Sequence, residues 1–386
     1  MWDVAIAGAG PAGSIAATIL ARAGARVLLV DRARFPRDKL CGDSLNPGTL
    51  ALLRKLDLSS WVEAHGVPVD GMLVTGPRGV SVEGRYPRPL RGRIALRRDF
   101  DHWLLAEAVR AGAQFEEHVI VRGPRVEQRA NGGNSTHVTG LVVSTRHGGS
   151  RTIPARMTIA ADGRRSALSF GLGLAHHPVW PRRWAVGAYF EGVSARSPLG
   201  EMHIRVGSYL GVAPLQNGLT NACAVTSGST LGSMRTPERA LRAMIEHDPT
   251  LRERFADARM VARPVVLGPL AVEVRSCGLP GLLLAGDAAG FVDPMTGDGL
   301  RFAVHGAELA AEAALEMLAT GRTDGHVLLA NRRRKAFAAK WRFNRALRRI
   351  VDMPVALGAA ESAASIAPAL FRALVIFAGD CADIAS

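Results

Sequence analysis

The chain opens with an apolar run, a glycine-rich turn and a stretch of small residues. Val4–Ala7 is continuously apolar, which is typical of a buried strand, and the Ala-rich segment Ser14–Arg22 predicts a helix. Between them lies the spacing G-x-G-x-x-G, and a second apolar run ends at Asp31. Strand, glycine turn, helix and strand in this order predict the first βαβ unit of a Rossmann-like α/β fold.

This unit has the features of a dinucleotide site. Gly8 permits the tight turn, Gly10 lets the backbone approach a phosphate, and Gly13 lets the helix press on the sheet. The positive helix N-terminus then faces the pyrophosphate. Asp31 is placed to accept both hydroxyl protons of the adenosine ribose, which favours FAD or NAD over a 2′-phosphorylated nucleotide.

Further elements follow from the same patterns. Alternating segments predict strands over 67–96, 114–160 and 175–268, with a turn at 132–135 and one charged helix near 237–248. Other helices are expected over about 49–56, from Arg97 with Asp99 or Asp101 near its cap, and over about 299–318.

The pattern predicts two interleaved domains and a tail. A discontinuous nucleotide-binding domain is expected to take residues 1–72, 97–174 and 269–320. A β-rich substrate domain, inserted into it, takes 73–96 and 175–268. Residues 321–386 form a C-terminal helical region.

Composition narrows the possible partners. The net charge is +14, yet only four basic residues are lysine and no aromatic-interleaved basic motif accompanies them, so we expect no nucleic-acid binding. The four cysteines are scattered, which indicates neither a disulfide framework nor a metal site and suits a reducing cytoplasm. The apolar stretch 353–378 is too interrupted by proline and charge to span a bilayer, and the N-terminus lacks the basic start of a signal peptide.

Three separated segments resemble the FAD-binding motifs of the p-hydroxybenzoate hydroxylase-type flavoproteins. They are the glycine turn with Asp31, Ala161–Gly163 before Ser166, and Gly286–Ala289 before Pro294. The resemblance covers nearly the whole chain and implies a flavoprotein fold of that type. It implies the following FAD-binding residues: Gly8, Gly10, Pro11, Ala12, Gly13, Asp31, Arg32, Cys41, Gly42, Arg97, Asp162, Gly163, Gly286, Asp287, Ala288, Pro294, Gly297, Gly299 and Leu300.

The resemblance also implies individual roles. Asp287 would accept hydrogen bonds from the ribityl chain, and the amides of 297–300 would face the flavin N1 and C2 carbonyl, where a positive helix end stabilises the anionic reduced flavin. Arg97 resembles the flavin-contacting arginine of the family. Asp162 and Gly163 are linked in the family to both FAD and NAD(P)H.

Two segments are similar to those of geranylgeranyl reductases and, more distantly, of halogenases. These are Lys39–Gly42 and Asp293–Gly299. The aromatic Y-x-W-x-F-P segment of those reductases is missing, with Tyr209–Pro214 as its nearest counterpart, and so is the halogenase tryptophan motif.

We therefore expect first an NAD(P)H-dependent monooxygenase that hydroxylates a hydrophobic aromatic or polyketide-like substrate through a flavin hydroperoxide. The alternative is a reductase of prenyl or other lipid double bonds. A non-catalytic flavin-binding or electron-transfer protein is a third class, which the absence of iron–sulfur cysteine spacing disfavours.

Cys41 and Asp298 are the candidate catalytic residues. Cys41 could handle protons or substrate beside the flavin, or it could be a small buried hydrophobe. Asp298 faces the same position, with capping of the following helix as the alternative. Arg37, Lys39 and Asp43 are interpreted as loop charges rather than acid–base groups.

The segment Arg332–Arg349 is rich in arginine, with aromatic residues at helical spacing. It is interpreted as a solvated helix packed by its aromatics, with peripheral contact to anionic lipid on the inner membrane surface as the alternative. The sequence leaves open the substrate, the choice of NADH or NADPH and the oligomeric state.

Overall fold

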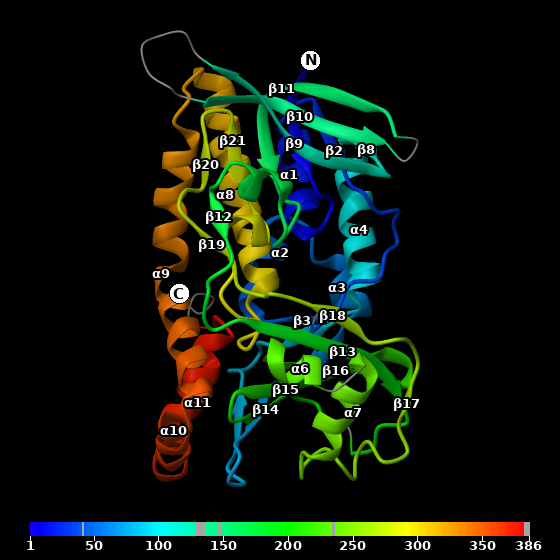
Figure 1. Ribbon diagram of the computed structural model, residues 1–386, viewed down its shortest axis with the longest axis vertical. Coiled ribbons are helices and arrows are strands. Elements are labelled where there is room, and N and C mark those ends of the chain that lie inside the picture. Colours follow the sequence, from blue (N-terminus) through cyan, green and yellow to red (C-terminus); the bar gives the residue numbers. More distant parts are fainter. Residues whose placement is uncertain (41, 129–135, 146–147, 196, 234–235, 382–386) are drawn as a thin grey trace.

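The computed structural model describes residues 1–40, 42–128, 136–145, 148–195, 197–233 and 236–381. Cys41 and the turn expected at 132–135 lie outside these residues. The described elements form two large sheets, one in the upper and one in the lower half of Figure 1, with helices packed beside them.

The upper sheet carries the predicted βαβ unit. Its parallel strands are β8 (Gln114–Glu116), β2 (Val27–Val30), β1 (Trp2–Ala7), β11 (Ser150–Ala160) and β21 (Leu282–Leu284), in that spatial order. Antiparallel strands β20 (Gly278–Leu279), β9 (Val119–Gln128) and β10 (Thr136–Thr145) extend it.

The strand register brings the carboxyl ends of four parallel strands level. Ala7 pairs with Val30 and Ala160, and Ala160 pairs with Leu284. Because the strands are parallel, the segments that follow β1, β11 and β21 begin at the same edge of the sheet. All three motif segments singled out in the sequence therefore start there.

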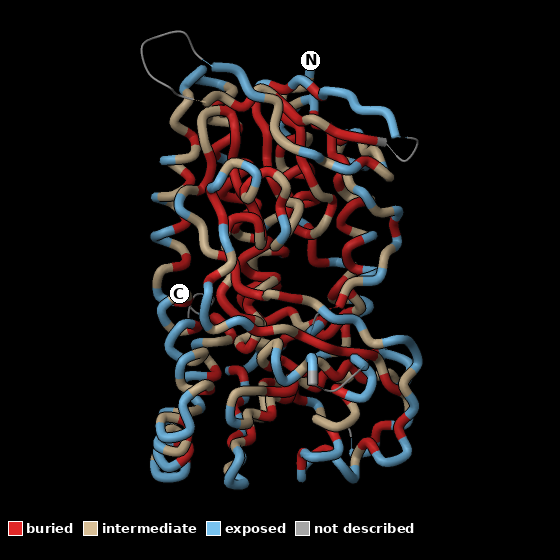
Figure 2. Tube along the Cα trace, in the orientation of Figure 1, coloured by how far each residue is buried: buried red, intermediate tan, exposed pale blue. Residues whose placement is uncertain are grey.

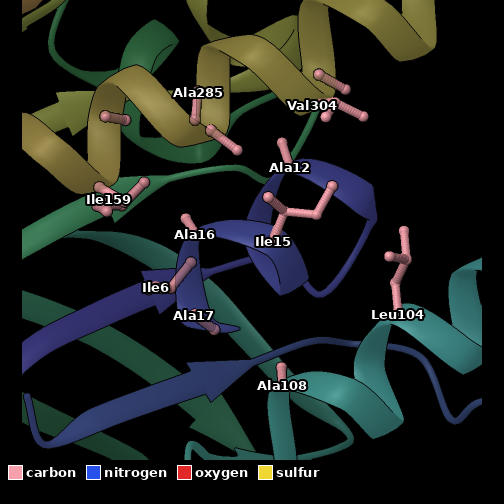
Figure 3. Packing of buried hydrophobic residues seen from close by; sticks show 14 of the residues in the cluster. Ile6, Ala12, Ile15, Ala16, Ala17, Leu104, Ala108, Ile159, Ala285 and Val304 are labelled. Carbon is pink, nitrogen blue, oxygen red and sulfur yellow. The ribbon is translucent and has the colours of Figure 1, made fainter. Parts of the chain in front are cut away.

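Helices cover this sheet. They are α1 (Pro11–Arg22), α4 (Arg97–Arg110), α8 (Gly299–Thr320) and α9 (Gly325–Asp352), with the short helices α2 (Pro47–Lys55), α3 (Ser60–His65) and α5 (Ala167–Gly171) nearby. Figure 3 shows the alanines of α1 beside Ile6, Val304 and Ala108 in one apolar cluster. Small side chains on α1 let it pack closely between α8 and α4.

The lower sheet is mainly antiparallel. Its strands are β17 (Arg259–Met260), β13 (Arg183–Glu191), β16 (Thr220–Ser227), β15 (Ser208–Pro214), β14 (Gly200–Arg205), β5 (Gly71–Thr75) and β6 (Ser81–Arg85), with β18 (Val265–Leu267) beside β13. Helices α6 (Gly228–Ser233) and α7 (Pro237–Glu246) pack on it. β5 and β6 belong to this lower sheet, although they precede α4, a helix of the upper half, in the chain. The domain limits expected from the sequence stay a prediction.

Smaller elements complete the fold. They are the sheet of β3 (Ser44–Leu45), β7 (Gly92–Ile94) and β4 (Val67–Val69), the pair β12 (Ala175–His176) and β19 (Glu273–Val274), and the 3-10 turns η1 (Gln216–Gly218) and η2 (Gly286–Ala289).

The chain ends in α10 (Pro354–Ile366) and α11 (Pro368–Ala378), at the lower left of Figure 1. Figure 2 shows α10 largely exposed, whereas the central strands β1, β2 and β13 are largely buried. Within the described residues, no single helix has the length and apolar composition needed to span a bilayer. The helices α10 and α11 have this length and composition only when taken together, and they are bent by 110° relative to each other.

The mixed α/β fold with C-terminal helices is confirmed, and the strands expected over 67–96 and 175–268 are present. Helix starts were predicted less well. α1 and α2 begin at Pro11 and Pro47, two or three residues before the predicted starts, because proline fits the first turn, where its missing N–H costs no hydrogen bond.

Candidate active site

Three turns meet at the carboxyl edge of the upper sheet. A Cβ atom on Gly8 would lie 2.5 Å from the carbonyl oxygen of Ala161, and one on Gly13 would lie 1.8 Å from that of Gly8. A Cβ on Gly286 would lie 2.9 Å from the Cβ of Ala12. The motif segments after β1, β11 and β21 are therefore in direct contact, and glycine is required where they touch.

The first turn of α1 offers an anion site. Gly10 stands at the N-cap, Pro11 at the first helical position, no side chain caps the helix and the first turn contains no acid. The Arg37 guanidinium lies 3.4 Å from where a Cβ on Gly10 would stand. Backbone N–H groups, a helix dipole and an arginine together fit a diphosphate.

Asp31 links the ends of β1 and β2. Its two carboxylate oxygens accept the N–H groups of Ala9 and Ala33, each at 2.8 Å. These bonds fix the orientation of the carboxylate at the end of β2, and each oxygen keeps a second lone pair for a ribose hydroxyl. Arg32, the next residue, is exposed.

Positive charge gathers around Lys39. Burial, together with the charges of Arg97, Arg164 and Arg37, lowers its pKa to about 8, while Asp287 opposes this shift. The Nε of Arg164 is buried without a hydrogen-bond partner, and burial lowers the pKa of this arginine too. These cations are poorly hydrated and outnumber the carboxylates that act on Lys39. They therefore favour an anionic ligand, so this cluster also fits a dinucleotide.

Arg97 is held by Asp101, one of the two acids expected near the cap of its helix. Asp101 is fully buried and accepts two bonds from Arg97, from Nε at 2.7 Å and from Nη2 at 2.9 Å. Leu96 occupies the N-cap of α4, and Asp99 is exposed in the first turn. Asp99 therefore lies near the cap, as expected, whereas Asp101 instead orients the guanidinium of Arg97.

A second helix, α8, passes the same turn, because a Cβ atom on Gly306 would lie 4.0 Å from the backbone nitrogen of Gly286, which itself packs against Ala12; Gly299 opens this helix. Asp298 stands at the N-cap of α8 as expected, but its side chain makes no capping bond. It instead contacts Asn46 at 3.2 Å, Thr296 at 2.7 Å and Lys340 at 3.4 Å. Asp298 therefore does not cap α8, contrary to the expected capping role, and no side chain caps the start of this helix. A catalytic role of Asp298 stays a prediction.

Asp43 was interpreted from the sequence as a loop charge, and the structure corrects this interpretation. It is fully buried, with backbone φ of 54°, and its Oδ2 accepts Tyr189 Oη at 3.0 Å and Asn221 Nδ2 at 2.5 Å. Its Oδ1 accepts the N–H of Arg97 at 3.3 Å. Burial raises the pKa of Asp43 to about 7, although these bonds oppose the shift. A carboxyl that can carry a proton near neutral pH thus lies where the Arg97 helix meets the lower sheet.

The loop before α8 is tied to the lower sheet. Asp293 is buried and accepts the hydroxyl of Tyr209 on β15 at 2.5 Å and a guanidinium N–H of Arg183 at 3.2 Å. Burial raises the pKa of Asp293 even though Arg183 opposes this. Around the contact lies an apolar cluster formed by Leu40, Ala185, Tyr209, Val225, Leu270, Met295 and Val351.

A family model described as an FAD binding domain matches residues 1–343 of the chain. The chain belongs to this family of FAD-dependent oxidoreductases. The converging turns, the two uncapped helix starts and the cationic cluster are the features that fit FAD, and the resemblance to p-hydroxybenzoate hydroxylase-type flavoproteins is confirmed.

Named relatives cover most of the chain. The menaquinone reductase of Mycolicibacterium smegmatis is 31% identical over 341 residues, which are 83% of this chain and 78% of that protein. The digeranylgeranylglycerophospholipid reductase 2 of Methanopyrus kandleri is 29% identical over 337 residues, 85% of this chain and 80% of that protein. The solved structure of the flavin-dependent brominase Bmp2 superposes with a TM-score of 0.83 at 20% identity, covering 98% of this chain and 94% of that one, which shows a shared fold.

The structure brings most of the predicted FAD residues to one place. The α1 turn, Asp31, Arg97, the turn of Asp162 and Gly163, η2 and the loop before α8 surround the same edge of the sheet. Asp162 accepts the N–H of Ala167 through Oδ2 at 2.8 Å, while its buried Oδ1 has no partner. Gly42 and Arg32 are exposed, and Cys41 lies outside the described residues.

Several residues of the site have no sequence signal. Lys340 and Arg333, both buried, come from the arginine-rich helix α9, where charge indicated solvent. Arg333 donates to the carbonyl of Ala289 at 2.9 Å and so holds η2 from behind. Asp43, Tyr189 and Asn221 could have been linked only by knowing that β13 and β16 lie against the Asp43 loop.

Proposed function

We propose that the chain is an FAD-dependent reductase that saturates carbon–carbon double bonds in the isoprenoid part of a lipid. The names of two relatives, which cover four fifths of this chain or more, contain an isoprenoid quinone and a geranylgeranylated phospholipid. The hydroxylation expected first from the sequence stays a prediction; the relatives favour the alternative.

The observation that carries this proposal is the buried pair of Asp43 and Tyr189. Reducing an alkene requires a hydride and a proton. Reduced FAD, when bound, supplies the hydride. The chain must hold the proton, and Asp43, with a pKa of about 7, can do so in contact with the Tyr189 hydroxyl. The pair joins the Arg97 helix start to β13 of the lower sheet.

The remaining residues position and shield the reaction. Asp101 fixes Arg97, and Asp293 ties the loop before α8 to Tyr209. The apolar cluster around Met295 and Leu40 would exclude water from a hydrophobic chain. We expect a nicotinamide dinucleotide to be the electron donor, with Asp162 and Gly163 as the candidate contacts.

The test is product analysis without oxygen. FAD-loaded protein with NADPH or NADH, and either menaquinone or digeranylgeranylglycerophospholipid, should yield a lipid with two more hydrogen atoms for each bond reduced. Asp43→Asn should keep its FAD and lose most of this activity. Turnover that requires oxygen, with an oxygen atom in the product, would establish the monooxygenase instead.

A further inference from the structure

The last two helices carry an unusual share of exposed apolar side chains. Val355 and Ile366 on α10 are 85% and 84% exposed, and Leu370 on α11 is 63% exposed. Met353, Leu374 and Phe377 are exposed as well. Apolar groups gathered in this way mark an interaction surface rather than scattered surface hydrophobes.

Charge is almost absent from this surface. Residues 353–378, all of which the structure describes, contain Glu361 and Arg372 as their charged residues. Glu361 is buried and ion-paired with Arg78 on the turn between β5 and β6, with Arg78 Nε at 2.9 Å. Arg372 is exposed. The outer face of the helix pair therefore exposes apolar side chains, the hydroxyls of Ser362 and Ser365 and one cation.

The adjoining end of α9 is cationic. Arg342, Arg345 and Arg349 are exposed there, whereas Arg333 is buried. Each of the three acids among residues 342–381, a range fully described, is ion-paired: Asp352 with Arg183, Glu361 with Arg78 and Asp380 with Arg301. Within residues 342–381, positive charge is thus not balanced by exposed acid.

We propose that α10, α11 and the end of α9 form a docking surface for an anionic lipid bilayer. Apolar side chains would enter the boundary between headgroups and acyl chains, while the arginines would contact lipid phosphates. The surface lies along the membrane and does not cross it. It refines the alternative considered from the sequence, in which Arg332–Arg349 itself contacts lipid; the apolar part of the surface comes from the helices after that segment.

The surface is fixed to the flavin site. Lys340 Nζ donates to the carbonyls of Phe377 and Ala378 at 2.7 and 2.8 Å and lies 3.4 Å from Asp298, which precedes α8. Phe343 on α9 packs edge-on against Phe377 at 5.2 Å between ring centroids. A bilayer held by α11 would therefore lie at a fixed place relative to the candidate active site.

The experiment is vesicle flotation of the full-length, FAD-loaded protein. Phosphatidylcholine vesicles containing phosphatidylglycerol should carry the protein upward, and vesicles of phosphatidylcholine alone should carry far less. The double variant Ile366→Glu with Leu370→Glu should weaken binding by roughly tenfold or more for each side chain. Arg342→Gln, Arg345→Gln and Arg349→Gln should weaken it by roughly fivefold for each arginine.

Val179→Glu is the matched control, because Val179 is 91% exposed but lies outside these helices. It should float like the natural chain, and all variants should keep their FAD. Flotation of the double variant at the level of the natural chain would overturn the proposal. So would sedimentation showing a dimer that Ile366→Glu converts to a monomer, because the surface would then be covered by a second copy of the chain.

Discussion

The two helix starts at the candidate flavin site, those of α1 and α8, are built in different ways. At α1 neighbouring residues alone form the helix start: Gly10 is the N-cap and Pro11 the first helical residue. At α8 the residue before the helix is Asp298, which would ordinarily cap it, yet Asn46 and Lys340 draw its carboxylate away. Similar positive helix ends thus arise from a local motif in one case and from long-range contacts in the other.

The largest expected effect comes from the local motif. Gly13→Ala places a Cβ atom 1.8 Å from the carbonyl oxygen of Gly8, which is backbone and cannot move aside. We expect purified protein without bound flavin, measured as loss of visible absorbance relative to protein content. Gly171→Ala, where a Cβ meets nothing within 4 Å, is the matched control and should retain its colour. Full flavin content in Gly13→Ala would show that α1 does not depend on this close approach.

The long-range contacts are tested by Lys340→Met. Lys340 lies within 3.4 Å of Asp298 and 3.1 Å of Asp380, both buried. Removing the Lys340 ammonium group leaves a buried carboxylate charge uncompensated, which should lower the free energy of unfolding by about 3–5 kcal/mol. Chemical denaturation should show this loss, and the exposed Lys335→Met should show almost none. Equal stability of the two variants would mean that the α8 start does not rely on α9.

The Asp43 carboxyl gives a pH test. Its folded pKa of about 7 lies above the ordinary 3.8, so the folded state holds a proton that the unfolded state has lost between those values. Stability contributed by the protonated carboxyl is present below about pH 4 and is lost as the pH rises to about 7, by about 1.4 kcal/mol per pH unit. Asp43→Asn should therefore gain stability relative to the natural chain across this range. A constant difference from pH 4 to 8 would contradict the raised pKa.

A smaller effect is expected from Asp31→Asn. The charged acceptor at the ribose position is lost, which is worth about 1.5–3 kcal/mol and should weaken FAD binding roughly ten- to hundredfold. Titration of flavin-free protein with FAD, followed by flavin fluorescence, measures this. Asp38→Asn, in the exposed loop nearby, should bind FAD normally. Unchanged affinity in Asp31→Asn would place the ribose elsewhere.

Prediction from sequence succeeded where structure is local. The order of β1, glycine turn and α1 follows from neighbouring residues, and so does the length of α8. The sequence did not predict those parts of the site that depend on tertiary contacts. Asp43 follows a charged, Pro-rich loop that looks solvated in sequence, and only the packing of β13 and β16 against it makes it a buried acid. Lys340 looked solvated for the same reason.

We expect the starts of α1 and α8 to face one FAD molecule from two sides. A crystal structure of the FAD complex tests this expectation most directly. We predict the diphosphate on the amides of Ala12 and Gly13, and the isoalloxazine N1 and C2 carbonyl against the backbone of Gly299 and Leu300. An FAD that contacts the start of α1 while its isoalloxazine lies away from α8 would contradict the account.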